Sequence, residues 1–178
     1  MPALSASKIH TLLENSRIGE TTTQRGRALE EALCYIFGRV PGIAITHRDQ
    51  LNTFQSEEID VALWNDKRTK AFDFLPNIVL LESKNWSNAV GSAEVAWFDT
   101  KLRNRGLDFG ILIALNGITG NAGDKTAAHQ IIATSLGEQR RLIVITGDDL
   151  LSLHTTLDLV TLIKTKLCEL AVTGTLFP

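Results

Sequence analysis

The sequence has few cysteines and prolines and no long apolar run. The two cysteines, Cys34 and Cys168, lie far apart in apolar helical patterns. Such a pair predicts neither a disulfide framework nor a zinc site, and it is typical of a reducing cytosol. No run approaches the roughly 18 apolar residues that span a bilayer, and the first residues lack the apolar core of a signal peptide. We therefore expect a cytoplasmic protein without a membrane partner.

The chain also lacks an excess of positive charge. It has 18 Lys and Arg against 20 Asp and Glu, which gives a formal net charge of −2. This balance excludes a polybasic binder, so any nucleic-acid site must rest on local positive charge. Hydrophobic residues make up 44% of the chain and charged residues 21%, which is globular composition. A length of 178 residues predicts one domain over 1–178.

Apolar periodicity predicts the order of helices and strands. Helical patterns cover 5–16, 21 to about 38, 92–105, about 124–137 and the segments of 148–171; strand patterns cover 43–48, 57–64, 77–84, 109–115 and 141–146. The first three strands suit an antiparallel meander, and the last two follow helices as in parallel βαβ units. We expect a three-layer α/β/α fold with a mixed central sheet. Its core is about 22–146, with the N-terminal helix and the C-terminal helices packed on it.

Charged residues occur inside these strand patterns. Glu82 and Lys84 share one face of a predicted strand, and Asp60 lies within the preceding one, where it can come opposite Glu82. Two converging carboxylates repel each other, and a hard cation such as Mg²⁺ relieves that repulsion. A lysine beside the metal can hold a water and offset charge growing on a phosphate. An ordinary cross-strand ion cluster is the alternative, but Glu58 shares the face of Asp60, and this excess of carboxylates favours a cation site.

A further carboxylate comes from the helix that begins near residue 21. On a helical wheel, Glu30 lies at the edge of the buried stripe of this helix, whereas Glu31 faces solvent. We therefore expect Glu30, and not Glu31, to lean over the sheet edge towards the metal.

The segments "RGRALE", "EIDVAL" and "LLESKNW", in this order, resemble the PD-(D/E)xK nuclease superfamily and its Mrr-like, restriction-endonuclease-like branch over roughly residues 22–146. The resemblance implies that Asp60 is the motif aspartate, that Glu82 and Lys84 form the (D/E)xK pair, and that Glu30 is the helix glutamate. It further implies Mg²⁺-dependent phosphodiester hydrolysis, with Mn²⁺ as a substitute. The expected metal ligands are Asp60, Glu82, the main-chain carbonyl of Ser83, and Glu30 through water. DNA is the expected substrate, in a restriction or phage-defence role.

The sequence departs from this family on the helix that follows the (D/E)xK strand. Many Mrr-like members have a glutamine there, whereas this chain has Trp97 and Lys101. Trp97, Lys101 and Arg105 follow each other at i, i+4 and i+8, and we expect this stripe to lie opposite the core-facing side of the helix. It could bind a phosphate backbone near the metal or be a solvated face. The full set of expected nucleic-acid contacts is Trp86, Trp97, Lys101, Arg105, Asn116 and Thr119.

Two other functions remain open at this point. The domain could be a catalytically silent, nuclease-like module that binds nucleic acid or a partner protein. The loop over 117–126 could bind a nucleotide, although Asp124 stands before Lys125 where a phosphate loop needs glycine. A homodimer or a partner subunit could supply targeting.

Overall fold

The computed structural model describes residues 1–51, 58–67, 69–120 and 127–175. The elements are α1 (Ala6–Ile18), α2 (Thr22–Phe37), β1 (Ile43–Leu51), β2 (Glu58–Asn65), β3 (Ile78–Lys84), α3 (Ser92–Asn104), β4 (Phe109–Ala114), α4 (Ala127–Gly137), β5 (Arg141–Ile145), α5 (Gly147–Leu151) and α6 (Thr156–Thr173). The element order is the predicted one. Asp124 and Lys125, which belong to the alternative nucleotide-binding loop, lie outside the described ranges.

The five strands form one mixed sheet in the order β1-β2-β3-β4-β5. β1, β2 and β3 pair antiparallel, whereas β3, β4 and β5 pair parallel. The parallel half follows from α3 and α4, which carry the chain back across the sheet between successive strands. The predicted mixed α/β fold is confirmed.

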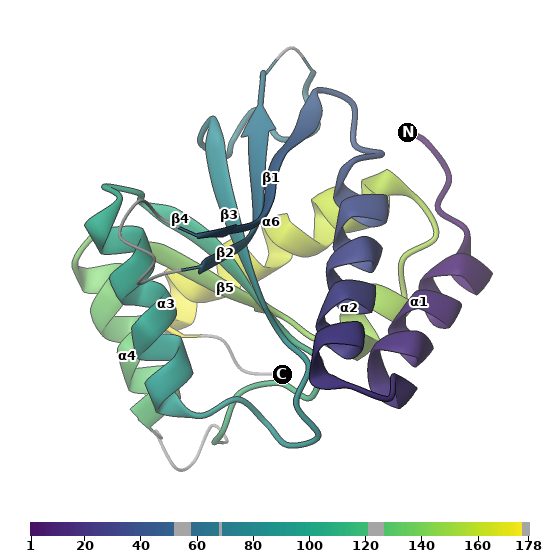
Figure 1. Cartoon of the computed structure of the whole chain (residues 1–178). Helices are drawn as coiled ribbons and strands as arrows, with labels where there is room; N and C mark the ends of the chain where they lie inside the picture. The colour runs from purple at the N-terminus through teal and green to yellow at the C-terminus, as the bar shows by residue number, and fades with distance from the viewer. Residues whose placement is uncertain (52–57, 68, 121–126, 176–178) are drawn as a thin grey trace.

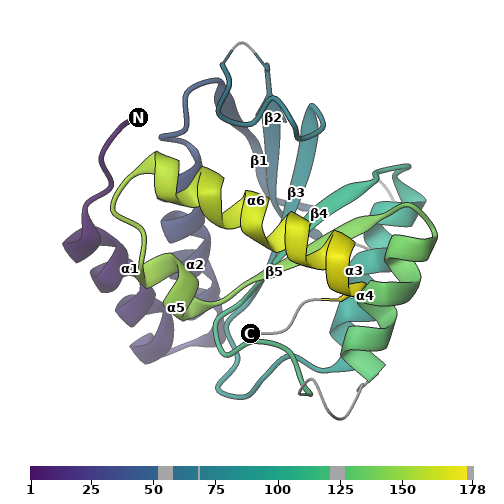
Figure 2. The same ribbon diagram turned by 180° about the vertical axis from the view of Figure 1, so that it is seen from behind.

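Helices flank both faces of the sheet (Figure 1). α3 and α4 lie on one side and α1 and α2 on the other, while α6 packs against β5 and crosses the side seen in Figure 2. α2 begins at Thr21, whose side chain accepts from the backbone N–H of Gln24 in a capping box. Its buried face carries Leu29, Leu33 and Ile36, which are all fully buried, so the predicted phase of this helix is confirmed.

β4 lies at the centre of the core, and all six of its residues are buried. A Cβ on Gly110 would come within 2.8 Å of Phe98 and 2.7 Å of Leu102, so this glycine lets α3 lie close against β4. The predicted core stripe of α3 is confirmed, because Val95, Phe98 and Leu102 are buried. This close contact fixes α3 beside the strands that carry the acidic residues.

β1 continues to Leu51, three residues beyond the predicted strand, and contains an irregularity between Ile45 and His47. After this shift Arg48 pairs with Val61 of β2. Directly paired residues point to the same face, so Arg48 points to the side of the buried Val61. None of the helices in the described part of the chain is long and apolar enough to cross a membrane.

Candidate active site

Asp60 and Glu82 meet where the pairing of β2 with β3 ends. Val61 and Leu81 form the last pair at this end of the ladder. The residues just beyond this pair are Asp60 on β2 and Glu82 on β3. Both carboxylates lie on the face opposite Val61, because side chains alternate along a strand. The predicted convergence of these two acids is present in the structure.

Asp60 is held by the strand beside it. One carboxylate oxygen, Oδ2, accepts hydrogen bonds from the backbone N–H of Ser83 at 2.6 Å and from its hydroxyl at 2.9 Å. Burial, followed by the nearby charge of Glu82, raises the pKa of Asp60 above its ordinary value. These effects outweigh the two bonds from Ser83, so the folded state disfavours the ionised carboxylate of Asp60.

Glu82 lies between two lysines. Its side chain is 2% exposed, its Oε1 accepts from Lys84 Nζ at 2.8 Å, and its Oε2 accepts from Lys101 Nζ at 2.7 Å. Burial disfavours the charged form of Lys84, but the charge and the hydrogen bond of Glu82 together raise the pKa of Lys84. Lys84 is therefore a cation beside this carboxylate.

The structure corrects the expected position of Lys101. Lys101 is 3% exposed and points into the acidic site, where its Nζ also donates to the main-chain oxygen of Glu58 at 2.7 Å. Residues four apart drift by about 40° around a helix, so Lys101 lies beside the buried stripe of α3 and not opposite it. Trp97 remains exposed, while Arg105 is half-buried and donates to the carbonyl of Lys101. The sequence pattern correctly indicated Lys101 as a site residue, but the prediction that it lies opposite the core-facing side of α3 is wrong.

Glu30 is buried, as the wheel predicted, and Glu31 is exposed. The partner of Glu30 is unexpected, since Arg48 Nε donates to Glu30 Oε2 at 3.0 Å. Burial, followed by the hydrogen bond between Glu30 and Asp49, raises the pKa of Glu30 to about 7. Arg48 was missed, although charge inside a strand pattern is the signal that identified Asp60, and Asp49 lies just beyond the predicted strand 43–48.

Glu30 therefore does not join Asp60 and Glu82 directly. Among the described residues, no three His, Cys, Asp or Glu side chains lie close enough to hold a metal ion together. Glu30 and Arg48 meet on the face of Val61, whereas Asp60 points to the other face. Roles for Glu30 through water and for the Ser83 carbonyl stay predictions.

Lys84 also lines a hollow of about 390 Å³ between the end of β3 and the start of α2. Arg25 and Gly26 of α2 also line this hollow, together with Trp86, which follows β3. Trp86 is 45% exposed. Arg25 and Lys84 bring positive charge to the hollow, and the first turn of a helix adds to it through its unpaired N–H groups.

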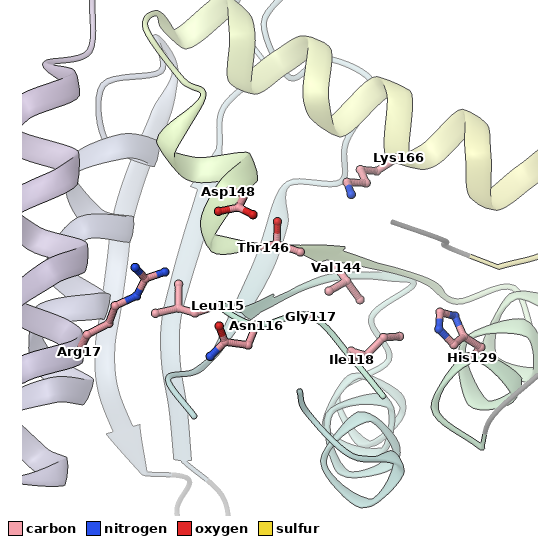
Figure 3. A pocket seen from close by; sticks show the side chains of 10 residues that line it. All are labelled: Arg17, Leu115, Asn116, Gly117, Ile118, His129, Val144, Thr146, Asp148 and Lys166. Atoms are coloured by element: carbon pink, nitrogen blue, oxygen red, sulfur yellow. The ribbon is translucent and has the colours of Figure 1, made fainter. Parts of the chain in front are cut away.

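Asn116 lies at the carboxyl ends of β4 and β5, beside a second hollow of about 390 Å³. Figure 3 shows Arg17 from α1 and Lys166 from α6 at the rim of this hollow. The amide of Asn116 donates to the carbonyl of Trp86. The two hollows are therefore neighbours at the carboxyl ends of the parallel strands. Thr119 is exposed beyond Asn116 and its N–H donates to Val90.

The chain matches a known protein family. A restriction endonuclease family model, that of the Mrr catalytic domain, matches residues 26–153. The chain belongs to this restriction endonuclease family. The matched range contains Glu30, Asp60, Glu82 and Lys84, and the restriction-endonuclease-like fold expected from the resemblance is confirmed. No curated protein matches the chain significantly.

Proposed function

We propose that the chain is a divalent-metal-dependent endonuclease that hydrolyses phosphodiester bonds of DNA. The observation that carries this proposal is the meeting of Asp60 and Glu82 beside Lys84, at the edge of a positively charged hollow. Membership of the restriction endonuclease family supports nuclease chemistry.

The donor set fits Mg²⁺ or Mn²⁺. Mg²⁺ is commonly bound by one or two carboxylates together with waters and substrate phosphate. Asp60 and Glu82 supply two carboxylates. Burial, and then the charge of Glu82, raises the pKa of Asp60, and a divalent cation relieves the repulsion between the two acids. When bound to them, the ion supplies Lewis acidity towards the scissile phosphate and makes the attacking water more acidic. The Ser83 carbonyl, and Glu30 through water, are further proposed ligands.

Lys84 is the proposed partner of the attacking water. Its Nζ contacts Glu82 and its side chain is 23% exposed, so it can leave that carboxylate for a substrate in the hollow. Water adds to phosphorus and loses a proton to solvent, the bond from phosphorus to the leaving sugar oxygen breaks, and that oxygen takes a proton from solvent. The Lys84 ammonium orients the water and stabilises the negative charge that grows on the phosphate. Arg25 and the first turn of α2 hold a neighbouring phosphate.

The rest of the proposed DNA path crosses the carboxyl ends of the parallel strands, from the hollow at Lys84 to the hollow at Asn116. Neighbouring strands are about 4.8 Å apart, so the distance from β3 to β5 is that of one or two nucleotides. We assign Trp86, Asn116 and Thr119 to this path, with Trp97 and Arg105 beside it. A restriction or phage-defence role in the cytoplasm, with a second copy or a partner subunit for targeting, completes the proposal.

One observation favours the silent module as a second candidate. Both oxygens of Glu82 accept hydrogen bonds from lysines, so two acids, Asp60 and Glu82, face two cations, Lys84 and Lys101. A site of this kind is close to charge balance without a metal, as in a nuclease-like domain that binds nucleic acid or a protein without cleaving it.

Cleavage of plasmid and single-stranded DNA with Mg²⁺, Mn²⁺ or a chelator tests the proposal. We expect cleavage with either metal, none with chelator, and a loss of at least about 10²-fold in Asp60→Asn, the range for a removed electrostatic stabiliser. Asp73→Asn is the matched control, because Asp73 is an exposed acid in the loop before β3. Binding of DNA without cleavage under every metal condition would support the silent module.

A further inference from the structure

Lys101 is a buried cation that enters the acidic site from α3. Its side chain is 4% exposed, and its Nζ lies 2.7 Å from Glu82 Oε2 and 2.7 Å from the main-chain oxygen of Glu58. Burial of an ammonium is unfavourable unless it is paired and hydrogen-bonded. The two contacts therefore fix Lys101, whereas Lys84, on the other oxygen of Glu82, is 23% exposed.

The two oxygens around Lys101 are also those that a divalent cation prefers. A carboxylate and a main-chain carbonyl are typical ligands of hard divalent ions. An ammonium in the same place carries one positive charge and donates hydrogen bonds to the same atoms. Lys101 thus occupies a position on Glu82 that a metal ion could otherwise take.

Two-metal sites hold their ions about 3.5–4 Å apart and need carboxylate oxygens for both. Within the described ranges, no three potential ligand side chains come together, and one oxygen of Glu82 is held by Lys101. The other oxygen, Oε1, is held by the partly exposed Lys84, so Asp60 and Glu82 Oε1 are open to metal once Lys84 turns away. These oxygens suffice for one ion whose remaining ligands are waters and substrate.

We propose that the Lys101 ammonium stands in the place of a second divalent ion. The site takes a single ion at Asp60 and Glu82 Oε1, and Lys101 is a positioning residue that holds Glu82 by its other oxygen. This inference rests on the metal site of the proposed function and adds the number of ions that the site accepts.

Mn²⁺ titration of the full chain without DNA tests the inference, with bound ion measured by calorimetry and by loss of the free Mn²⁺ electron paramagnetic resonance signal. We expect one ion per wild-type chain and none in Asp60→Asn. Lys101→Ala opens space beside Glu82 Oε2 and the Glu58 carbonyl, so it should bind two ions. Lys101→Met removes the charge but fills the space, and it should still bind one. Asp73→Asn, at the exposed acid in the loop before β3, should bind one ion as wild type does.

Two ions on the wild-type chain would overturn the inference while leaving the proposed function intact. A single ion on Lys101→Ala, bound as tightly as by wild type, would also overturn it. If Lys101→Ala does not fold by circular dichroism, the wild-type stoichiometry decides alone: one ion supports the inference and two reject it. If Lys101→Ala binds Mn²⁺ and wild type does not, the result supports the role of Lys101 and rejects metal dependence of the native chain. If neither protein binds Mn²⁺, the result rejects both the role of Lys101 and the proposed metal site.

Discussion

Lys84 is the residue whose loss should separate catalysis from binding. Its proposed contacts, to the attacking water and the charge on the phosphate, matter mostly in the transition state. We expect Lys84→Ala to bind DNA nearly as wild type and to cleave it at least about 10²-fold more slowly, as for other removed electrostatic stabilisers. Gel-shift titration beside single-turnover cleavage measures both quantities.

The matched control for Lys84 is the double variant Trp97→Ala with Arg105→Ala. It should weaken binding and flatten the salt dependence, because these residues are assigned to the backbone of DNA. Its cleavage rate should largely recover at saturating DNA. Normal cleavage by Lys84→Ala would remove the central residue of the proposed mechanism.

Glu30 should make the stability of the fold depend on pH. Its pKa is raised from 4.5 to about 7, by burial first and then by Asp49. The folded state therefore favours the protonated carboxyl, and the stability that this proton contributes is complete below about pH 4.5 and is lost as the pH rises through about 7. In chelator, the melting temperature of wild type should fall more over this range than that of Glu30→Gln.

Glu31→Gln is the control for Glu30, because Glu31 is the exposed neighbour on the same helix. It should keep the wild-type dependence on pH and the wild-type cleavage rate, whereas Glu30→Gln should lose cleavage. Identical pH profiles for Glu30→Gln and wild type would show that Glu30 does not hold this proton.

At the scale of elements, α2 has a glycine in its interior where alanine would be more favourable. A Cβ on Gly26 meets nothing within 4 Å, and the residue lines the hollow beside Lys84. Gly26→Ala should stabilise the fold by roughly 0.5–1 kcal/mol, or a few degrees of melting temperature. The added methyl narrows the hollow, so DNA affinity should fall as stability rises.

Gly137→Ala, at the end of α4, is the matched change away from the hollow, because its Cβ also meets nothing within 4 Å. It should leave DNA binding unchanged. Unchanged DNA affinity in Gly26→Ala would argue that the substrate does not enter this hollow.

The order of elements could be predicted because it depends on local periodicity. The pairing of Asp60 with Glu82 followed from period-two alternation in two neighbouring strands, and the burial of Glu30 followed from its helix phase. The Arg48–Glu30 contact depends on the register shift in β1, which no local pattern encodes. The position of Lys101 depends on how closely α3 approaches the sheet, and Gly110 sets that distance through tertiary contact.

At the scale of the whole molecule, the candidate site should oppose folding until a cation binds. The raised pKa of Asp60, caused by burial and then by Glu82, means that the folded state disfavours the ionised carboxylate. In chelator, Asp60→Asn should therefore melt at or above the wild-type temperature. Mn²⁺ at about 100 times its dissociation constant adds about 2.7 kcal/mol to wild type, which is about 5–10 °C for a chain of this size. The melting temperature of Asp60→Asn should not rise with Mn²⁺, whereas that of Asp73→Asn should rise as much as that of wild type. An equal gain in Asp60→Asn, measured by differential scanning calorimetry, would mean that Mn²⁺ binds elsewhere and that Asp60 and Glu82 are an ion cluster.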